Sequence, residues 1–170
     1  MWAGDDPPLI LCESRSLAGT LRSIAGNYLC PIASTNGQTG GFLRTSIACL
    51  MPRGVLYLGD YDSAGGHIEE NTRGVLEEYG LYDWTRVATT REQIGERRLV
   101  EIDKPDHRFK PVRYFKAVET EALGQSEIQR ILTEEIEERL PQPVAEIRER
   151  EREQRVQVRE ALKHLYGEAD

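Results

Sequence analysis

The chain has 170 residues, of which 39% are apolar and 30% are charged, and its formal net charge is −7. This composition allows one compact domain with an appendage, and it excludes collagen-like, wholly disordered and disulfide-framework proteins. No apolar run approaches the roughly 18 residues of a membrane span, and no basic region leads into an apolar run at the N-terminus. We therefore expect a cytoplasmic protein without membrane contacts.

The first half of the chain alternates short apolar runs with amphipathic segments. This alternation predicts an α/β fold with a mainly parallel sheet that carries helices on both faces. Strands are expected at residues 9–12, 31–33, 55–58 and 84–88, and helices at residues 16–28, 42–51 and 68–79.

The middle of the chain is basic, although the chain as a whole is acidic. Residues 86–116 contain nine Lys or Arg against five Asp or Glu, interleaved with aromatic residues. Such a segment is either a solvated loop or a nucleic-acid contact, with basic side chains on phosphates and rings on exposed bases. In the second case we expect Arg108, Lys110 and Arg113 to bind the substrate.

The last third of the chain has two parts. Residues 117–123 are expected to form a short strand, and residues 126–140 a helix with one apolar stripe. Two prolines follow, and the rest is mostly opposite charges at helical neighbour spacing, which is typical of a solvated helix. The sequence therefore predicts a domain at residues 1–140 and a charged helical extension at residues 141–170, which could bind a protein partner or self-associate.

Polar residues directly follow three of the predicted strands. They are Glu13, the glycine-rich loop at residues 34–41, and the pair Asp60 and Asp62. In a parallel sheet the carboxyl ends of the strands meet at one edge, so these residues are expected in one crevice. The two aspartates could bind Mg²⁺ there, although an Asp-x-Asp alone is also common in turns and at helix starts.

The order and strand placement of these motifs resemble the Toprim domain of topoisomerases, primases and related nucleases. The family's first-strand glutamate matches Glu13, its glycine-containing turn looks like residues 33–37, and its Asp-x-Asp looks like residues 59–65. Residues 118–123, before a helix, are most similar to the A subunit of topoisomerase VI. The resemblance covers about residues 9–140 and implies a Rossmann-like fold.

The resemblance also implies roles for the acidic residues. Asp60 and Asp62 would hold Mg²⁺ or Mn²⁺, and Glu13 would complete the coordination or act as a general acid or base. Arg15 would neutralise a phosphate oxygen or the charge that develops on it. Further candidates are Glu119, expected to face the crevice, Glu121, expected to pair with a basic side chain, and the substrate-binding residues Asn36, Gly37 and Gln38.

These features predict metal-dependent cleavage or transfer of phosphodiester bonds in nucleic acid, with DNA as the expected substrate. Strand passage is not expected, because no counterpart is found of the winged-helix module that carries the cleaving tyrosine in topoisomerase VI. Two other hypotheses stay open. One is a non-catalytic scaffold or subunit on DNA, which would bind without turnover. The other is a haloacid-dehalogenase-type phosphotransferase, whose Asp-x-Asp normally ends the first strand rather than the third.

Overall fold

The computed structural model describes residues 2, 6–36, 41, 43–47 and 53–166. Within them, four parallel strands form one sheet in the order β2-β1-β3-β4. The α/β class and the parallel sheet predicted from the sequence are therefore confirmed. The strands are β1 (Leu9–Cys12), β2 (Ile32–Ser34), β3 (Val55–Leu58) and β4 (Trp84–Ala88).

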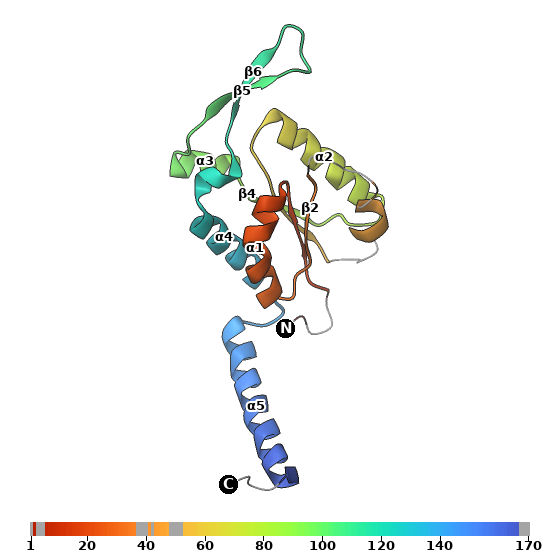
Figure 1. Ribbon diagram of the computed structural model, residues 1–170, viewed down its shortest axis with the longest axis vertical. Coiled ribbons are helices and arrows are strands. Elements are labelled where there is room, and N and C mark those ends of the chain that lie inside the picture. Colours follow the sequence, from red (N-terminus) through yellow and green to blue (C-terminus); the bar gives the residue numbers. More distant parts are fainter. Residues whose placement is uncertain (1, 3–5, 37–40, 42, 48–52, 167–170) are drawn as a thin grey trace.

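Helices cover both faces of this sheet (Figure 1). Successive side chains of a strand point to opposite faces, so the wholly apolar β1 and β3 supply two cores at once. On one face, α1 (Arg15–Asn27) and α4 (Gln125–Glu137) pack against the sheet. On the other, α2 (Ser63–Glu77) packs through Val75 and Leu76.

Two helices begin earlier than the sequence predicted, because polar side chains cap them. The Ser14 side chain accepts a hydrogen bond from the Leu17 N–H, so α1 begins at Arg15. Asp62 caps α2 in the same way, through the Gly65 N–H. From the helix expected at residues 42–51, the structure describes only a short π-helix, η1 (Leu43–Ile47).

The basic segment is not a loop. After β4 it forms α3 (Arg91–Arg97) and an antiparallel hairpin of β5 (Ile102–Asp106) and β6 (Arg113–Ala117). The strand expected at residues 117–123 is wrong. β6 ends at Ala117, Val118 makes a single antiparallel bridge with Tyr61, and the 3-10 helix η3 (Thr120–Leu123) follows.

Two elements project from opposite ends of the body (Figure 1). The β5–β6 hairpin lies at the end where the acidic residues are expected. At the other end, α5 (Val144–Tyr166) is a 23-residue helix with no buried residue. Of all the described helices, none is both long enough and apolar enough to cross a membrane.

Two leucine substitutions compare the buried helix α4 with the exposed helix α5. Leu132 of α4 is fully buried, so Leu132→Ala should lower the free energy of unfolding by about 2–5 kcal/mol. Leu162 of α5 is 48% exposed, so Leu162→Ala should lower it by less than about 0.5 kcal/mol. Urea denaturation measures both. A large, concentration-dependent loss in Leu162→Ala would instead show that α5 is covered by a second copy or another chain.

Candidate functional site

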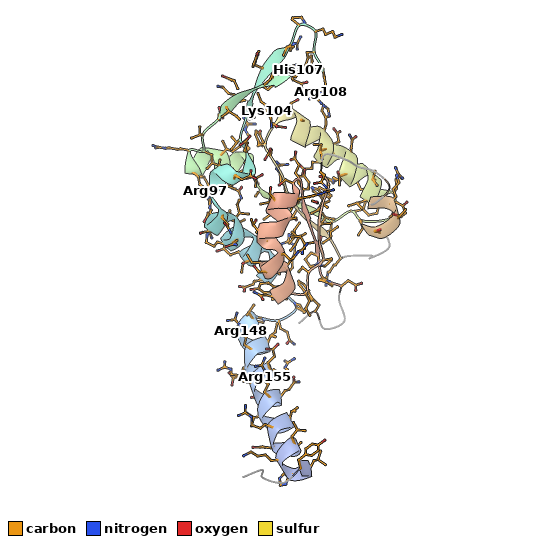
Figure 2. All side chains as sticks on the ribbon, viewed as in Figure 1. Arg97, Lys104, His107, Arg108, Arg148 and Arg155 are labelled. Atoms are coloured by element: carbon orange, nitrogen blue, oxygen red, sulfur yellow. The ribbon has the colours of Figure 1, made fainter. Side chains whose placement is uncertain are left out.

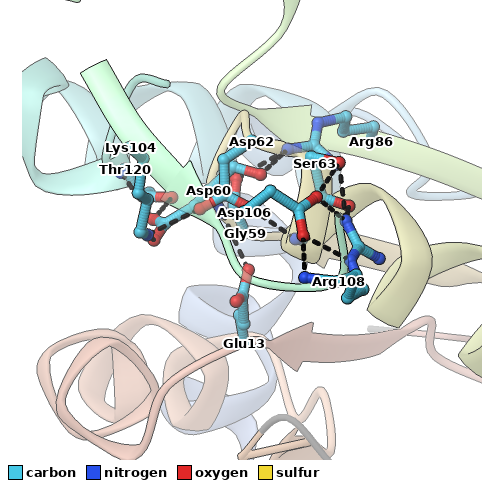
Figure 3. A network of polar contacts seen from close by, with 11 residues as sticks. Glu13, Gly59, Asp60, Asp62, Ser63, Arg86, Lys104, Asp106, Arg108 and Thr120 are labelled. Atoms are coloured by element: carbon cyan, nitrogen blue, oxygen red, sulfur yellow. Dashed lines mark hydrogen bonds and ion pairs between the residues drawn. The ribbon is translucent and has the colours of Figure 1, made fainter. Parts of the chain in front are cut away.

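Glu13, Asp60 and Asp62 lie at the same edge of the sheet. Glu13 directly follows β1, and the two aspartates follow β3, its parallel neighbour, with Cys12 opposite Leu58 in the register. The Glu13 N–H donates to the Leu58 carbonyl at 2.8 Å, and the Asp60 N–H donates to Glu13 Oε2 at 2.9 Å (Figure 3). The expected placement of these acids at neighbouring strand ends is therefore confirmed.

Gly65 lets the carboxylates approach each other closely. A Cβ atom at this position would lie 2.6 Å from the Asp60 carbonyl oxygen. It would also lie 3.3 Å from both Glu13 Oε2 and Asp62 Oδ1. These two oxygens are thus separated by no more than twice that distance. Any side chain at position 65 would force the turn after β3 to open.

Each of the three carboxylates accepts a hydrogen bond from a backbone N–H. Besides the bond to Glu13, the Thr120 N–H donates to Asp60 Oδ1 at 2.9 Å, and the Gly65 N–H donates to Asp62 Oδ1 at 2.5 Å. The Thr120 hydroxyl lies 3.2 Å from the same Asp60 oxygen. Backbone donors fix the position of these carboxylates, and at Asp62 the bond from Gly65 also lowers the pKa.

Lys104 of β5 brings a positive charge into the acidic edge (Figure 3). Its Nζ lies 2.6 Å from Asp62 Oδ2 and 4.0 Å from Asp60 Oδ2. Burial alone would raise the pKa of Asp62, but the hydrogen bonds from Gly65 and Lys104 hold it below its ordinary value. The hydrogen bond to Asp62 in turn raises the pKa of Lys104. The lysine is thus the cation that the structure itself places between the two aspartates.

Glu13 and Tyr57 form the buried side of the edge. Burial raises the pKa of Glu13, and the negative charges of Asp60 and Asp62 raise it further. The Tyr57 hydroxyl is buried and has no hydrogen-bond partner among the described residues. A Cβ at Gly59 would lie 2.6 Å from this hydroxyl and 2.8 Å from Glu13 Oε2. A buried hydroxyl without a partner costs free energy, so Tyr57 is an unsatisfied donor in the neighbourhood of Glu13.

Arg86 of β4 holds the turn that carries Asp60, and sequence reasoning missed it. Its Nη2 donates to the carbonyls of Gly59 and Asp60, both at 2.8 Å (Figure 3). Its Nη1 forms an ion pair with Glu69. Glu69 also accepts a hydrogen bond from Trp84 at 2.9 Å. A charged residue inside a strand was the available signal, because such a residue needs partners when it is half-buried.

The other predicted residues of the crevice lie in different surroundings. Arg15 is exposed at the start of α1. Asn36 is also exposed, and its backbone N–H donates to the Glu13 carbonyl at 2.9 Å, so the end of β2 is tied to the site. Gly37 and Gln38 lie outside the described residues.

Glu119 and Glu121 do not share the face of a strand, since no strand forms there. Both side chains are exposed. The charge of Glu119 contributes to the raised pKa of Lys104, so Glu119 lies beside the acidic edge. Glu121 instead borders a separate pocket between α1 and α4, together with Ser16 and Gln125. No ion pair of Glu121 with a described residue is found, contrary to the expected pairing with a basic side chain.

The three basic residues expected to bind substrate all lie on the hairpin or its turn. Arg108 makes an ion pair with Asp106 at 2.5 Å and donates to the Ser63 hydroxyl at 2.7 Å, which fastens the hairpin to the start of α2 (Figures 2 and 3). The Arg113 guanidinium lies 4.7 Å from the centre of the Phe109 ring, and Lys110 is exposed. Arg108 is therefore partly neutralised, whereas Lys110 remains available to a ligand.

No match was found to protein-family models, to curated proteins or to solved structures. Among the described residues, no group of three His, Cys, Asp or Glu side chains is already arranged as a metal site. The three acids at the edge nevertheless supply the carboxylate oxygens that a hard divalent cation prefers. The ammonium of Lys104 balances part of their charge.

Removing the charge of Lys104 should raise the pKa values of both Asp62 and Glu13, since Lys104 lowers each of them. Because the pKa of Asp62 is depressed in the folded protein, its contribution to stability is present above its ordinary pKa and is lost as the pH falls through the folded value. The stability that Asp62 contributes, and that acidification removes, should be smaller in Lys104→Gln. NMR titration of the carboxyl carbons, with EDTA present, measures the pKa values.

Lys110→Gln is the matched control, because Lys110 lies on the same hairpin but is exposed in its turn. It should leave both titrations unchanged. An Asp62 titration in Lys104→Gln identical to that of the wild type would contradict the role given to the lysine.

Proposed function

We propose that the acidic edge binds Mg²⁺ or Mn²⁺ and cleaves or transfers phosphodiester bonds of nucleic acid, with DNA as the expected substrate. The observation that carries the proposal is the convergence of Glu13 and Asp60 from two neighbouring strands, joined by a hydrogen bond of 2.9 Å, with Asp62 beside them. The resemblance of the same residues to the Toprim motifs supports this function independently of the geometry.

The side chains at the acidic edge are of the chemical kind that a divalent cation binds. Asp60 and Asp62 would hold it, and Glu13 would either complete the coordination or act beside it as a general acid or base. One oxygen of each carboxyl group accepts a backbone hydrogen bond. The second oxygen of Asp62 accepts one from Lys104, a contact that the cation would have to displace. When bound, the metal ion would polarise the phosphate and lower the pKa of a bound water.

The chain's own groups have separate parts in this proposal. Glu13 has a raised pKa, which brings it closer to neutrality and suits it to take up or release a proton near the phosphate. Arg86 fixes the carbonyls of Gly59 and Asp60 and so keeps the Asp60 carboxylate in place. Lys104 would leave Asp62 for the phosphate when another cation takes over the charge of the aspartates.

A non-catalytic scaffold is the second candidate, and the Lys104 contact favours it. An ammonium 2.6 Å from Asp62 balances charge without any metal ion, as a structural ion pair would. In that case the protein would bind nucleic acid through the basic hairpin, and the acids would only hold the hairpin against the body. Turnover distinguishes the two functions, because a scaffold binds without cleaving.

The decisive variant is Asp60→Asn, because it removes the charge while the amide oxygen can still accept the hydrogen bond from Thr120. Labelled single-stranded and duplex DNA and RNA are incubated with Mg²⁺, Mn²⁺ or EDTA. We expect metal-dependent cleavage by the wild type and a loss of about a hundredfold or more in Asp60→Asn.

Asp103→Asn serves as the control, because Asp103 pairs with Lys116 on the hairpin and does not belong to the edge. It should cleave like the wild type. Binding without cleavage under all metal conditions would favour the scaffold. Equal cleavage by wild type and Asp60→Asn would refute the proposed site.

A further inference from the structure

The β5–β6 hairpin has two faces of different chemistry. In the register of the hairpin, Lys104 lies opposite Phe115, and Asp106 lies opposite Arg113. These side chains share one face, because alternate residues of paired strands point to the same side. That face meets the acidic edge, since Lys104 reaches Asp62. Tyr114, between Arg113 and Phe115, points to the opposite side.

Phe115 is the aromatic residue of the hairpin that faces the acidic edge, where Tyr61 also lies between the two aspartates. Its ring is 37% exposed, and it borders two adjoining pockets of about 400 and about 430 Å³, a size typical of small-molecule sites. The first pocket is also lined by Asp62, Ser63, Lys104 and Arg108, and the second by Asp60, Glu69, Arg86 and Lys116. Both pockets therefore combine carboxylates and basic groups with the Phe115 ring, whereas Tyr61 lines only the second pocket.

Neighbouring groups hold the Phe115 ring in place. The Phe109 ring lies 5.7 Å from it, centre to centre, at an angle of 46°. The guanidinium of Arg113 lies over the Phe109 ring. A ring that is supported on one side and remains more than a third exposed loses little conformational entropy when a planar ligand stacks on it.

We propose that Phe115 stacks against an unpaired base of the nucleic acid whose phosphate lies at the acidic edge. This inference rests on the proposed function, because it takes nucleic acid as the ligand. Lys104 and Arg108 border the same pocket as Phe115, so a phosphate and the base attached to it meet complementary groups within one site. A base inside a duplex is stacked on both faces and cannot meet the ring. The favoured substrate is therefore single-stranded, or has an end or distortion that frees a base.

Binding is measured by fluorescence anisotropy with three labelled oligonucleotides of equal length. Ca²⁺ replaces Mg²⁺, so that a cation balances the aspartates, and electrophoresis checks that the strands stay intact. One is single-stranded, one is duplex, and one is single-stranded with abasic sites, which keeps the phosphates and removes the bases. The wild type should bind the base-bearing single strand about tenfold more tightly than the abasic strand. Phe115→Leu keeps an apolar side chain without an aromatic face, and it should abolish this difference.

Tyr114→Leu is the matched control, because Tyr114 lies next in the chain, is 67% exposed and lines neither of the two pockets. It should keep the preference for bases.

Tryptophan fluorescence gives a direct readout of stacking when Phe115 is replaced by tryptophan. Phe115→Trp should be quenched by the base-bearing strand and not by the abasic strand, whereas Tyr114→Trp should not respond. The emission of the native Trp2 and Trp84 is measured in the wild type and subtracted from that of each variant.

Equal binding of the base-bearing and abasic strands by the wild type would overturn the inference, as would duplex binding as tight as single-strand binding. A preference for bases that survives in Phe115→Leu would assign the stacking to another ring. The circular dichroism spectrum and the unfolding midpoint of Phe115→Leu are compared with those of the wild type. Equal values exclude loss of the hairpin as the cause of a changed base preference. A base preference in a wild-type protein that cleaves no substrate with Mg²⁺ or Mn²⁺ would support the inference and contradict the nuclease.

Discussion

Negative charge concentrated at one edge of a parallel sheet is the constraint on which the rest of the structure depends. Glu13, Asp60 and Asp62 follow neighbouring buried strands, so their positions are set by the hydrophobic core and their mutual repulsion has to be offset locally. Hydrogen bonds from backbone N–H groups offset part of the repulsion. The missing side chain of Gly65 lets the turn after β3 pack closely against Glu13 and Asp62. The ammonium of Lys104 supplies the balancing positive charge.

The same charges connect the β5–β6 hairpin to the body. Lys104 contacts Asp62, and Arg108 contacts Ser63 at the start of α2. A short two-stranded hairpin is only marginally stable by itself, so these polar contacts determine where its ring and basic side chains lie. The position of the hairpin and the charge of the acidic edge are thereby coupled, because a change in charge at the aspartates also changes what holds the hairpin.

Much of the body could be predicted from the sequence, because β1 and β3 are continuous apolar runs that lead directly into acidic residues. The hairpin could not, since its strands are mostly exposed, contain Pro105 and show no alternation of apolar with polar residues. The bond from Thr120 to Asp60 joins residues 60 positions apart, and no local pattern signals it. The charged helix α5 could be predicted from the spacing of its charges, because opposite charges three or four residues apart stabilise a helix that has no buried side.

The most direct test of the central claim is to map where a divalent cation binds. Mn²⁺ is added to the isotope-labelled protein at substoichiometric amounts, and the paramagnetic broadening of each backbone amide signal is followed by NMR. The account predicts that Asp60, Gly65 and Thr120, whose amides donate to the acidic residues, broaden first. Broadening that begins among the glutamates of α5, while these three amides keep their intensity, would contradict it.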